Sequence, residues 1–338
     1  MCQDVIQADK KQLVGHQAIQ MKYNDSEVVA AGLDNKLHKN NGVYLSFVWD
    51  IINICNYKCS YCSAGYGNDE TRPVSTFFKN KTEQDIWRLV LLRLRMLKEH
   101  EWEISLLGGE PTLHPNLREI IDNLTKLEAC RSIYIITNMA KTLKYFLDLV
   151  DGVDDKLILN PSIHFEYYKP SVMDKTLELI TQTNTNIQPT VMLHDNPKYW
   201  TMMSEYLDMC VENGVEYNST FLEAAHDYEP KYTDEFFEQF SKYIQHGRGV
   251  DDVKYNIETA DGNEHEVTVE DIYKYNIKQF KGWQCTPKSW KISCGGGFEN
   301  SCTKQKMSVT GDNLICKTAC PNTTCGCNEW WMYRKERM

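Results

Sequence analysis

Hydrophobic residues recur along the chain in two alternating patterns between residues 43 and 223. Short apolar runs rich in β-branched side chains indicate buried strands, and longer segments with apolar residues at helical spacing indicate amphipathic helices. The six predicted strands cover residues 43–53, 102–110, 132–138, 155–164, 186–194 and 215–223. The helices between them are predicted over residues 82–101, 116–131, 141–152, 171–184 and 199–214.

Three residues refine the ends of these elements. Thr82 is a plausible N-cap for the first helix, because threonine hydroxyls accept hydrogen bonds from the amides of a first helical turn. Gly214 is placed to end the last helix. Pro189 lacks a backbone N–H and therefore weakens the fifth strand.

Strands that alternate with helices predict parallel βα units and an α/β fold. Such a sheet closes partly or fully into a barrel or stays open, and in each case the loops after the strands form the site. Polar and metal-binding residues follow the predicted strands closely. They are Cys55, Gly108–Glu110, Thr137, Asn138, Ser162, His164, His194, Asp195, Glu223 and His226.

Three regions are expected along the chain. Residues 1–42 are polar and predict an irregular or partly helical lead-in, and residues 43–229 form the βα core. Residues 230–338 form a C-terminal extension with a helix over 234–245, a hairpin over 253–269 that turns at Asp261 and Gly262, and a cysteine-rich tail.

Composition narrows the functional classes. The formal charge of −10 and the pI near 5.5 argue against a surface that tracks duplex DNA or long RNA. No secretory signal and no apolar run of membrane-spanning length is visible, so a cytoplasmic location is expected. In a reducing cytosol, the 13 cysteines indicate metal ligands or reactive thiols more than disulfides. Cys2, Cys130 and Cys210 are isolated and are expected to be ordinary apolar residues.

The chemistry centres on Cys55-x3-Cys59-x2-Cys62, with Tyr61 directly before the last cysteine. About fifty residues on, "GGEPTLHP" (108–115) follows a strand, and "ITN" (136–138) ends the next. This order resembles the radical S-adenosylmethionine (SAM) superfamily over roughly residues 43–225. A zinc site with His114 as the fourth ligand is the alternative interpretation of the three cysteines.

The resemblance implies a partial (β/α)6 TIM-like barrel with a small cysteine-rich C-terminal extension. In this family the three cysteines hold three irons of a [4Fe–4S] cluster, and the amino and carboxylate groups of SAM chelate the fourth iron. Cleavage of SAM then gives a 5′-deoxyadenosyl radical that abstracts hydrogen from a substrate. A flavodoxin- or ferredoxin-type protein is the implied electron donor.

The resemblance also implies roles for residues around SAM. Gly108 and Gly109 allow close approach to its methionine end, and the Glu110 carboxylate binds its amino group. Tyr61 rests against the adenine. Polar residues at the following strand ends complete the expected cosubstrate site, namely Asn138, Ser162 and His164. Family members often read "TNG" where this chain has Met139, so a glycine-dependent turn is not assured by the sequence.

Seven cysteines crowd into residues 285–327. A cysteine, a hairpin over 306–317, a Gly-x4-Cys spacing and a close cysteine group resemble the SPASM and twitch extensions of the superfamily, which hold auxiliary iron–sulfur clusters. The preferred set of ligands is Cys294, Cys316, Cys320 and Cys327, with Cys325 close behind, whereas a second spacing involves Cys285 and Cys302. One auxiliary [4Fe–4S] cluster is expected ahead of two clusters or a structural zinc.

The expected activity is hydrogen abstraction in peptide or protein modification or oxidation. The alternative substrate is a small sugar, nucleoside or amino acid, and the alternative class is a non-catalytic iron–sulfur electron carrier. Glu223, His226 and Tyr228 follow the sixth strand and are the candidate substrate-facing residues.

Overall fold

The computed structural model describes the chain in thirteen stretches. These are residues 28–32, 45–65, 81–153, 155–223, 225, 228–244, 255–259, 262, 264–267, 280–308, 314–315, 317–321 and 335–336. The chain divides into two compact units. Residues 46–251 and 291–298 form the first, which we call the βα unit. The remaining residues, 1–45, 252–290 and 299–338, form the second, which we call the tail unit.

The βα unit is built on one sheet with the strand order β13-β12-β2-β3-β4-β5-β7-β8, and with β6 paired to β5. The pairings from β3 to β8 are parallel, as in Ile135 opposite Leu159 and Thr190 opposite Asn218. The strands are β2 (Leu45–Ile52), β3 (Trp102–Gly108), β4 (Cys130–Thr137), β5 (Leu157–Ile163), β6 (Asn186–Ile187), β7 (Thr190–Leu193), β8 (Asn218–Phe221), β12 (Ser289–Ile292) and β13 (Phe298–Asn300).

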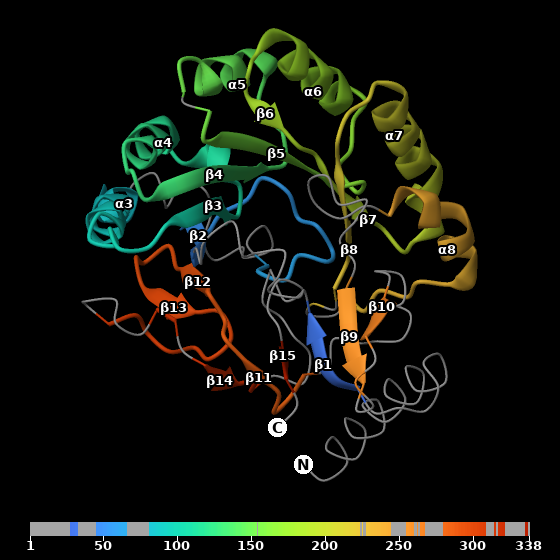
Figure 1. Cartoon of the computed structure of the whole chain (residues 1–338). Coiled ribbons are helices and arrows are strands. Elements are labelled where there is room, and N and C mark those ends of the chain that lie inside the picture. The colour runs from blue at the N-terminus through green and yellow to red at the C-terminus, as the bar shows by residue number, and fades with distance from the viewer. Residues whose placement is uncertain are drawn as a thin grey trace. The chain divides into compact units, whose positions relative to one another are not determined.

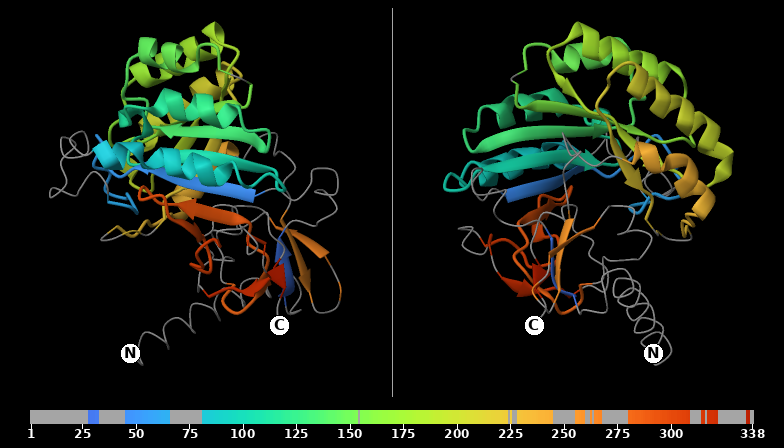
Figure 2. Two further views of the ribbon diagram at one scale, coloured as in Figure 1. Left: turned by 90° about the vertical axis from the view of Figure 1, so that its left-hand side faces the viewer. Right: turned by 45° about the vertical axis from the view of Figure 1, so that its right-hand side comes forward.

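Helices follow the strands in turn and cover the outer face of this sheet (Figure 1). They are α3 (Lys81–Leu94), α4 (Leu117–Thr125), α5 (Leu143–Val150), α6 (Ser171–Gln182), α7 (Trp200–Glu212) and α8 (Asp234–Phe240), with short 3-10 turns η1 (Pro111–Leu113), η2 (Pro197–Tyr199) and η3 (Ser241–Tyr243). The described strands form a curved sheet with two ends, which is a partial TIM-like barrel (Figure 2). The α/β fold predicted from the alternation of strands and helices is therefore confirmed.

Apolar faces explain this arrangement. All eight residues of β2 are buried, as expected of a strand covered on both faces of a parallel sheet. Helix α4 buries only the stripe made by Leu117, Ile120, Ile121 and Leu124. Phe47 packs edge-on against Trp102 at a centroid distance of 5.9 Å.

Two of the three predicted element ends are as expected, and one is wrong. The fifth predicted strand is interrupted at Gln188 and Pro189 and becomes β6 and β7, which fits the missing N–H of proline. Gly214 ends α7 with φ of +63°. Thr82 does not cap its helix, because α3 already begins at Lys81.

The tail unit carries a second sheet with the order β10-β9-β1-β15-β11-β14. Its strands are β1 (Val28–Gly32), β9 (Tyr255–Thr259), β10 (Glu264–Val267), β11 (Gln284–Cys285), β14 (Thr318–Ala319) and β15 (Lys335–Glu336). The antiparallel pairing of β9 with β10 confirms the predicted hairpin, with Gly262 at φ of +81° in the turn. The polar lead-in contributes a strand, because β1 pairs with both β9 and β15.

Candidate active site at the carboxyl ends of the strands

The three clustered cysteines lie in the loop that follows β2. All three are free thiols, with Cys59 buried and Cys55 and Cys62 half-buried. The loop folds as a compact turn in which the Cys62 amide donates to the Cys59 carbonyl at 3.2 Å. The Tyr57 amide points at Cys55 Sγ, 3.4 Å away. The loop therefore presents three sulfur atoms from one short segment.

Burial holds the thiols of Cys55 and Cys59 in their neutral form. It raises the pKa of Cys55 to about 11, with smaller contributions from the charges of Glu110 and Cys62. It raises the pKa of Cys59 to about 12, with Glu166 and Cys55 adding to the effect. Because thiolates and not thiols bind metals, loading of this site must release protons.

Three thiols on one loop fit the donor set of a [4Fe–4S] cluster, in which each of three irons takes one thiolate. In the part of the chain that the structure describes, no three His, Cys, Asp or Glu side chains converge to hold one metal ion. A cubane does not need such convergence, because each thiolate binds a different iron. His114, the alternative zinc ligand, is buried, and its Nδ1 accepts a hydrogen bond from the Asn116 amide at 3.1 Å.

The glycine pair after β3 lies directly against the chain that leads into the cysteine loop. A Cβ at Gly109 would be 1.9 Å from the Ile54 carbonyl oxygen and 2.8 Å from the Cys55 amide nitrogen. A Cβ at Gly108 would be 2.1 Å from the Ile52 oxygen, and its φ of +126° is one that other residues rarely adopt. The structure thus shows these glycines admitting protein backbone, whereas their expected approach to SAM stays a prediction.

Glu110 is fully buried and joins the ends of β3 and β4. Its Oε1 accepts hydrogen bonds from the Thr112 amide at 3.0 Å and from the hydroxyls of Thr112 and Thr137 at 2.6 and 2.7 Å. Its Oε2 accepts one, from the Asn138 amide at 2.8 Å. Burial raises the pKa of Glu110, while these hydrogen bonds oppose the shift. Since a carboxylate oxygen accepts two or more hydrogen bonds, Oε2 keeps capacity for another donor.

Asn138 brings the end of β4 to the cysteine loop. Its Nδ2 donates to Asn56 Oδ1 at 2.9 Å and lies 3.9 Å from Cys55 Sγ. The next residue, Met139, adopts a left-handed φ of +56° although it is a buried, non-glycine residue. Methionine thus makes the turn for which glycine is common, at a cost of about 1–2 kcal/mol.

The end of β5 approaches the same loop. Ser162 is buried on that strand. His164 Nδ1 lies 2.9 Å from the Tyr61 hydroxyl, to which it is hydrogen-bonded, and 3.7 Å from Cys59 Sγ. Burial lowers the pKa of His164 to about 4, so its imidazole is neutral at pH 7.

Tyr61 lies within a group of rings. Its ring stacks on that of His164 at 5.9 Å, meets His194 edge-on at 5.4 Å, and packs against Tyr228 at 5.8 Å. Burial raises the pKa of Tyr61. The ring that was expected against adenine therefore has protein neighbours from the ends of β5 and β7 and from the segment after β8.

The ends of β7 and β8 meet through Asp195. Its Oδ1 accepts a hydrogen bond from the Tyr228 hydroxyl, and its Oδ2 accepts one from the Lys231 amide at 2.7 Å. His194 is buried, and burial lowers its pKa against the opposing charges of Asp195 and Glu166. Among the predicted substrate-facing residues, Tyr228 is half-buried in this group and Glu223 is exposed. His226 lies outside the described residues.

Four residues of this site were not predicted from the sequence, namely Tyr57, Ser60, Glu166 and Tyr167. Glu166 accepts hydrogen bonds from the Ser60 amide at 2.8 Å and from its hydroxyl at 2.5 Å. Tyr167 stacks on Tyr57 with centroids 4.5 Å apart. All four are polar or aromatic residues, and Glu166 and Tyr167 come shortly after a predicted strand end, which is the signal that could have indicated them.

The tail cysteines are described only in part. Cys294, in the βα unit, is half-buried, and Cys285, Cys302 and Cys320, in the tail unit, are buried. Cys316, Cys325 and Cys327 lie outside the described residues, as does the turn of the hairpin predicted over 306–317. The auxiliary site therefore stays a prediction.

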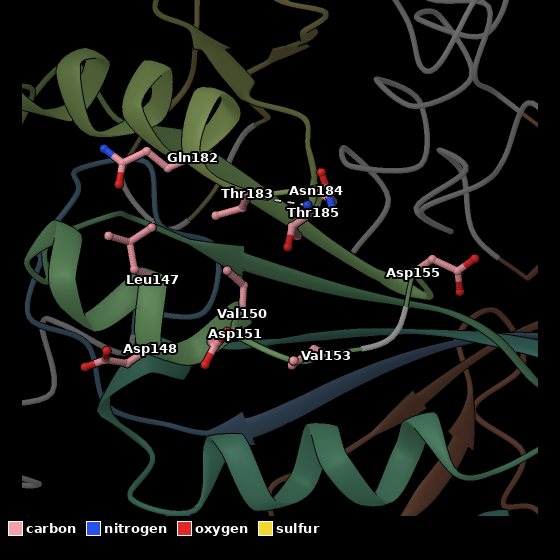
Figure 3. Close-up of a pocket in the computed structure, with 11 residues that line it drawn as sticks. Leu147, Asp148, Val150, Asp151, Val153, Asp155, Gln182, Thr183, Asn184 and Thr185 are labelled. Atoms are coloured by element: carbon pink, nitrogen blue, oxygen red, sulfur yellow. Dashed lines mark hydrogen bonds between the residues drawn. The ribbon is translucent and has the colours of Figure 1, made fainter.

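A separate pocket of about 540 Å³ lies where α5 and α6 end (Figure 3). Asp148, Asp151 and Asp155 line it together with Thr183–Thr185. These residues precede strands β5 and β6, so they belong to the amino ends of the strands, away from the end that carries the cysteine loop.

Among the described helices, none has the length and apolar character needed to cross a membrane.

Comparison with known families agrees with this geometry. The model of the Radical SAM superfamily matches residues 49–187, which run from β2 to β6 and include the cysteine loop and the glycine pair. Residues 49–187 are therefore a radical SAM domain, of a superfamily whose members are enzymes that use an iron–sulfur cluster and SAM.

Two curated relatives match over shorter stretches. Molybdenum cofactor biosynthesis protein 1 of Bos taurus is 37% identical over 84 residues, which are 25% of this chain and 12% of that protein. GTP 3',8-cyclase of Actinobacillus succinogenes is 32% identical over 89 residues, which are 26% of this chain and 24% of that protein. The match thus spans less than a quarter of each relative.

Solved structures match over more of the chain. Streptococcus suis SuiB bound to S-adenosylmethionine has a TM-score of 0.52 and 14% identity, and the match covers 82% of this chain and 67% of that one. SuiB bound to the precursor peptide SuiA has a TM-score of 0.52 and 15% identity, and covers 82% and 68%. At this identity the likeness concerns the fold, and it agrees with the partial barrel.

Proposed function

We propose that this chain is a radical SAM enzyme whose [4Fe–4S] cluster is held by Cys55, Cys59 and Cys62. The observation that carries the proposal is the loop of three free thiols after β2, packed against a glycine pair that leaves no room for a side chain. When bound, the cluster and SAM supply a 5′-deoxyadenosyl radical that removes hydrogen from an unreactive C–H bond.

The surrounding residues supply position and polarity for SAM. Glu110 Oε2 accepts one protein hydrogen bond and has capacity for the SAM ammonium group. Asn138 Nδ2 lies 3.9 Å from Cys55 Sγ and would offer a hydrogen-bond donor to SAM, and Ser162 and His164 would offer polar groups at the end of β5. Tyr61, whose ring stacks on His164, would offer an aromatic face to the adenine of SAM.

Iron content and SAM cleavage test this proposal together. The protein is reconstituted anaerobically with iron and sulfide, reduced in the presence of SAM, and assayed for 5′-deoxyadenosine. About four irons held by the loop, and 5′-deoxyadenosine formation that disappears in Cys59→Ala, are expected. A wild-type protein that holds no iron dependent on Cys59 would refute it. A loaded, reducible protein that never cleaves SAM with any substrate fraction would favour the electron carrier instead.

The substrate is proposed to be a peptide or protein, which is modified or oxidised at a C–H bond. The support is the likeness of fold across 82% of the chain to SuiB, whose structure was solved with a precursor peptide. The second candidate is a small sugar, nucleoside or amino acid. Its support is the local identity to GTP 3',8-cyclase, whose name denotes a nucleotide substrate.

Stimulation of SAM cleavage by size fractions of a cell extract separates the two candidates. A stimulating factor that is retained by an ultrafilter and destroyed by proteinase supports the peptide class. One that passes the filter and resists proteinase supports the small-molecule class, and added GTP tests the nucleotide directly. Alanine variants of Glu223, His226 and Tyr228 are expected to lower the stimulated rate.

The tail is proposed to hold one auxiliary [4Fe–4S] cluster through Cys294, Cys316, Cys320, Cys325 and Cys327, of which a cubane needs four. A total of about eight irons per chain supports it, and about four irons with bound zinc would make the tail site structural. A flavodoxin- or ferredoxin-type protein is the proposed electron donor, and the cytoplasm is the proposed location.

A further inference from the structure

Residues 164–168, which we call the post-β5 segment, hold the middle of the cysteine loop. The carboxylate of Glu166 accepts two hydrogen bonds from Ser60, at 2.8 Å from the amide and 2.5 Å from the hydroxyl. The Tyr167 hydroxyl accepts a third from the Lys58 amide at 3.0 Å. More than one hundred residues separate the partners in sequence, so the fold itself places this clamp.

The clamp supplies acceptors that the loop needs. Residues 57–61 form an irregular turn outside any strand, and their amides have no ladder partner. Side-chain oxygens of the post-β5 segment accept hydrogen bonds from two of these amides, those of Lys58 and Ser60. Hydrogen bonds to a carboxylate are stronger than those between neutral groups, so Glu166 stabilises the loop more than Tyr167 does.

The position of the carboxylate matters as well as its hydrogen bonds. Ser60 directly follows Cys59 in the loop, so the two hydrogen bonds hold the Glu166 carboxylate against the residue next to a proposed cluster ligand. His194 also lies near this carboxylate, with its Nε2 3.6 Å from Glu166 Oε1, beyond hydrogen-bond distance. The Glu166 side chain is 15% exposed, so solvent screens its charge only partly.

We infer that Glu166 is a positioning residue that both seats the cysteine loop and lowers the reduction potential of its cluster. The inference rests on the proposed function, because it needs a cluster on Cys55, Cys59 and Cys62. A fixed negative charge disfavours the added electron, and nearby charge is one of the factors that set cluster potentials. A lower potential strengthens the electron donation on which SAM cleavage depends.

Two substitutions at Glu166 separate the two effects. Glu166→Gln keeps an amide oxygen for the Ser60 amide and removes the charge. Glu166→Ala removes both. Glu212→Gln, at the exposed end of α7, is the matched control for loss of a carboxylate. The redox signal of the loop cluster is identified as the one that Cys59→Ala abolishes, and its midpoint potential is titrated by electron paramagnetic resonance.

Glu166→Gln is expected to raise the midpoint potential, with a change in the reduced-to-oxidised ratio of about tenfold, or about 59 mV for one electron. Glu212→Gln is expected to match the wild type. Glu166→Ala is expected to show the same rise and to lose iron to a chelator about tenfold faster than Glu166→Gln, because only the alanine variant also lacks an oxygen for Ser60.

Each outcome decides the question. An unchanged potential in Glu166→Gln overturns the electrostatic role, and equal iron retention in Glu166→Ala and Glu166→Gln overturns the positioning role. If the wild-type protein shows no signal that depends on Cys59, the proposed function fails, and this inference fails with it. A wild-type signal with unaffected Glu166 variants would refute the inference and leave the proposed function standing.

Discussion

The Glu110 carboxylate accepts a hydrogen bond from the Thr137 hydroxyl at 2.7 Å, inside the protein and between the ends of two neighbouring strands. This contact ties the turn after β3 to the end of β4, from which Asn138 reaches Cys55. The glutamate of the "GGEP" stretch is therefore a cross-link of the site itself. Its proposed contact with SAM uses the oxygen that accepts the fewer protein hydrogen bonds.

Replacing Glu110 with glutamine should destabilise the iron-free protein by about 1–3 kcal/mol. If the amide oxygen stays with the two threonines, the new NH2 group meets the Asn138 amide, and two buried donors face each other. Anaerobic urea unfolding of the iron-free protein measures the effect. Glu212→Gln, an exposed change of the same kind, should change the free energy of unfolding by less than about 0.5 kcal/mol. Equal stability of the two variants would contradict the cross-link.

Gly109→Ala should damage both stability and cluster loading. Its Cβ would lie 1.9 Å from the Ile54 oxygen, so the backbone that leads into Cys55 must move. Overpacking of this kind costs about 1–3 kcal/mol and sometimes more. Gly295→Ala is the control, because its Cβ would be 3.7 Å from the nearest atom, Ser293 Oγ. The free energy of unfolding in urea and the iron content after reconstitution should both fall in Gly109→Ala and stay at wild-type values in Gly295→Ala. Normal iron loading of Gly109→Ala would refute the steric argument.

Much of the βα unit was predictable because its signals are local. Alternating apolar runs and helical periodicities located six strand segments and the helices between them. The rule that parallel strands present their loops at one end then predicted that Cys55, Glu110, Asn138 and His164 would share a site. The contacts between Cys55 and Asn138 and between Cys59 and His164 agree with that prediction.

The missed features are those that depend on long-range contacts. Ser60 and Glu166 are 106 residues apart, and no periodicity or spacing links them. The close approach of Gly109 to Ile54 is equally invisible, because a glycine can serve a ligand, a turn or another backbone. Strand β1 was missed because its pairing with β9 joins residues more than two hundred positions apart. Local sequence carries no trace of such partners.

Met139 offers a direct test of backbone strain. Both Met139→Ala and Met139→Gly remove a buried side chain, at a cost of about 2–5 kcal/mol. Only glycine also relieves the left-handed φ of +56°. The glycine variant should therefore equal or exceed the alanine variant in stability, by up to about 1 kcal/mol after the greater chain entropy of glycine is subtracted.

A matched pair at Met173 provides the control for that comparison. Met173 is buried in the first turn of α6, where glycine is less favourable than alanine because glycine gains more chain entropy on unfolding. The order of the two variants should thus reverse between Met139 and Met173 in urea unfolding. The same order at both positions would show that the strain at Met139 is relaxed in solution.

The stability of the iron-free protein should fall as the pH drops from 6.5 toward 4. Burial lowers the pKa of both His114 and His164 from 6.5 to about 4. Between these values the unfolded chain binds protons that the folded chain does not, so acid favours unfolding. The shift corresponds to on the order of 3 kcal/mol for each histidine, and on the order of 2 kcal/mol of that should be lost by pH 5.

His114→Asn isolates one of these two contributions without touching the cysteine loop. In the wild type, the Asn116 amide donates a hydrogen bond to His114 Nδ1 at 3.1 Å, and the asparagine side chain keeps an acceptor for this amide. The difference in unfolding free energy between pH 7 and pH 5 should shrink by about 2 kcal/mol in this variant. Leu124→Ala, which shortens a buried side chain on α4, should lose about 2–5 kcal/mol at both pH values and keep the wild-type difference. If His114→Asn keeps that difference as well, burial of His114 does not suppress its protonation.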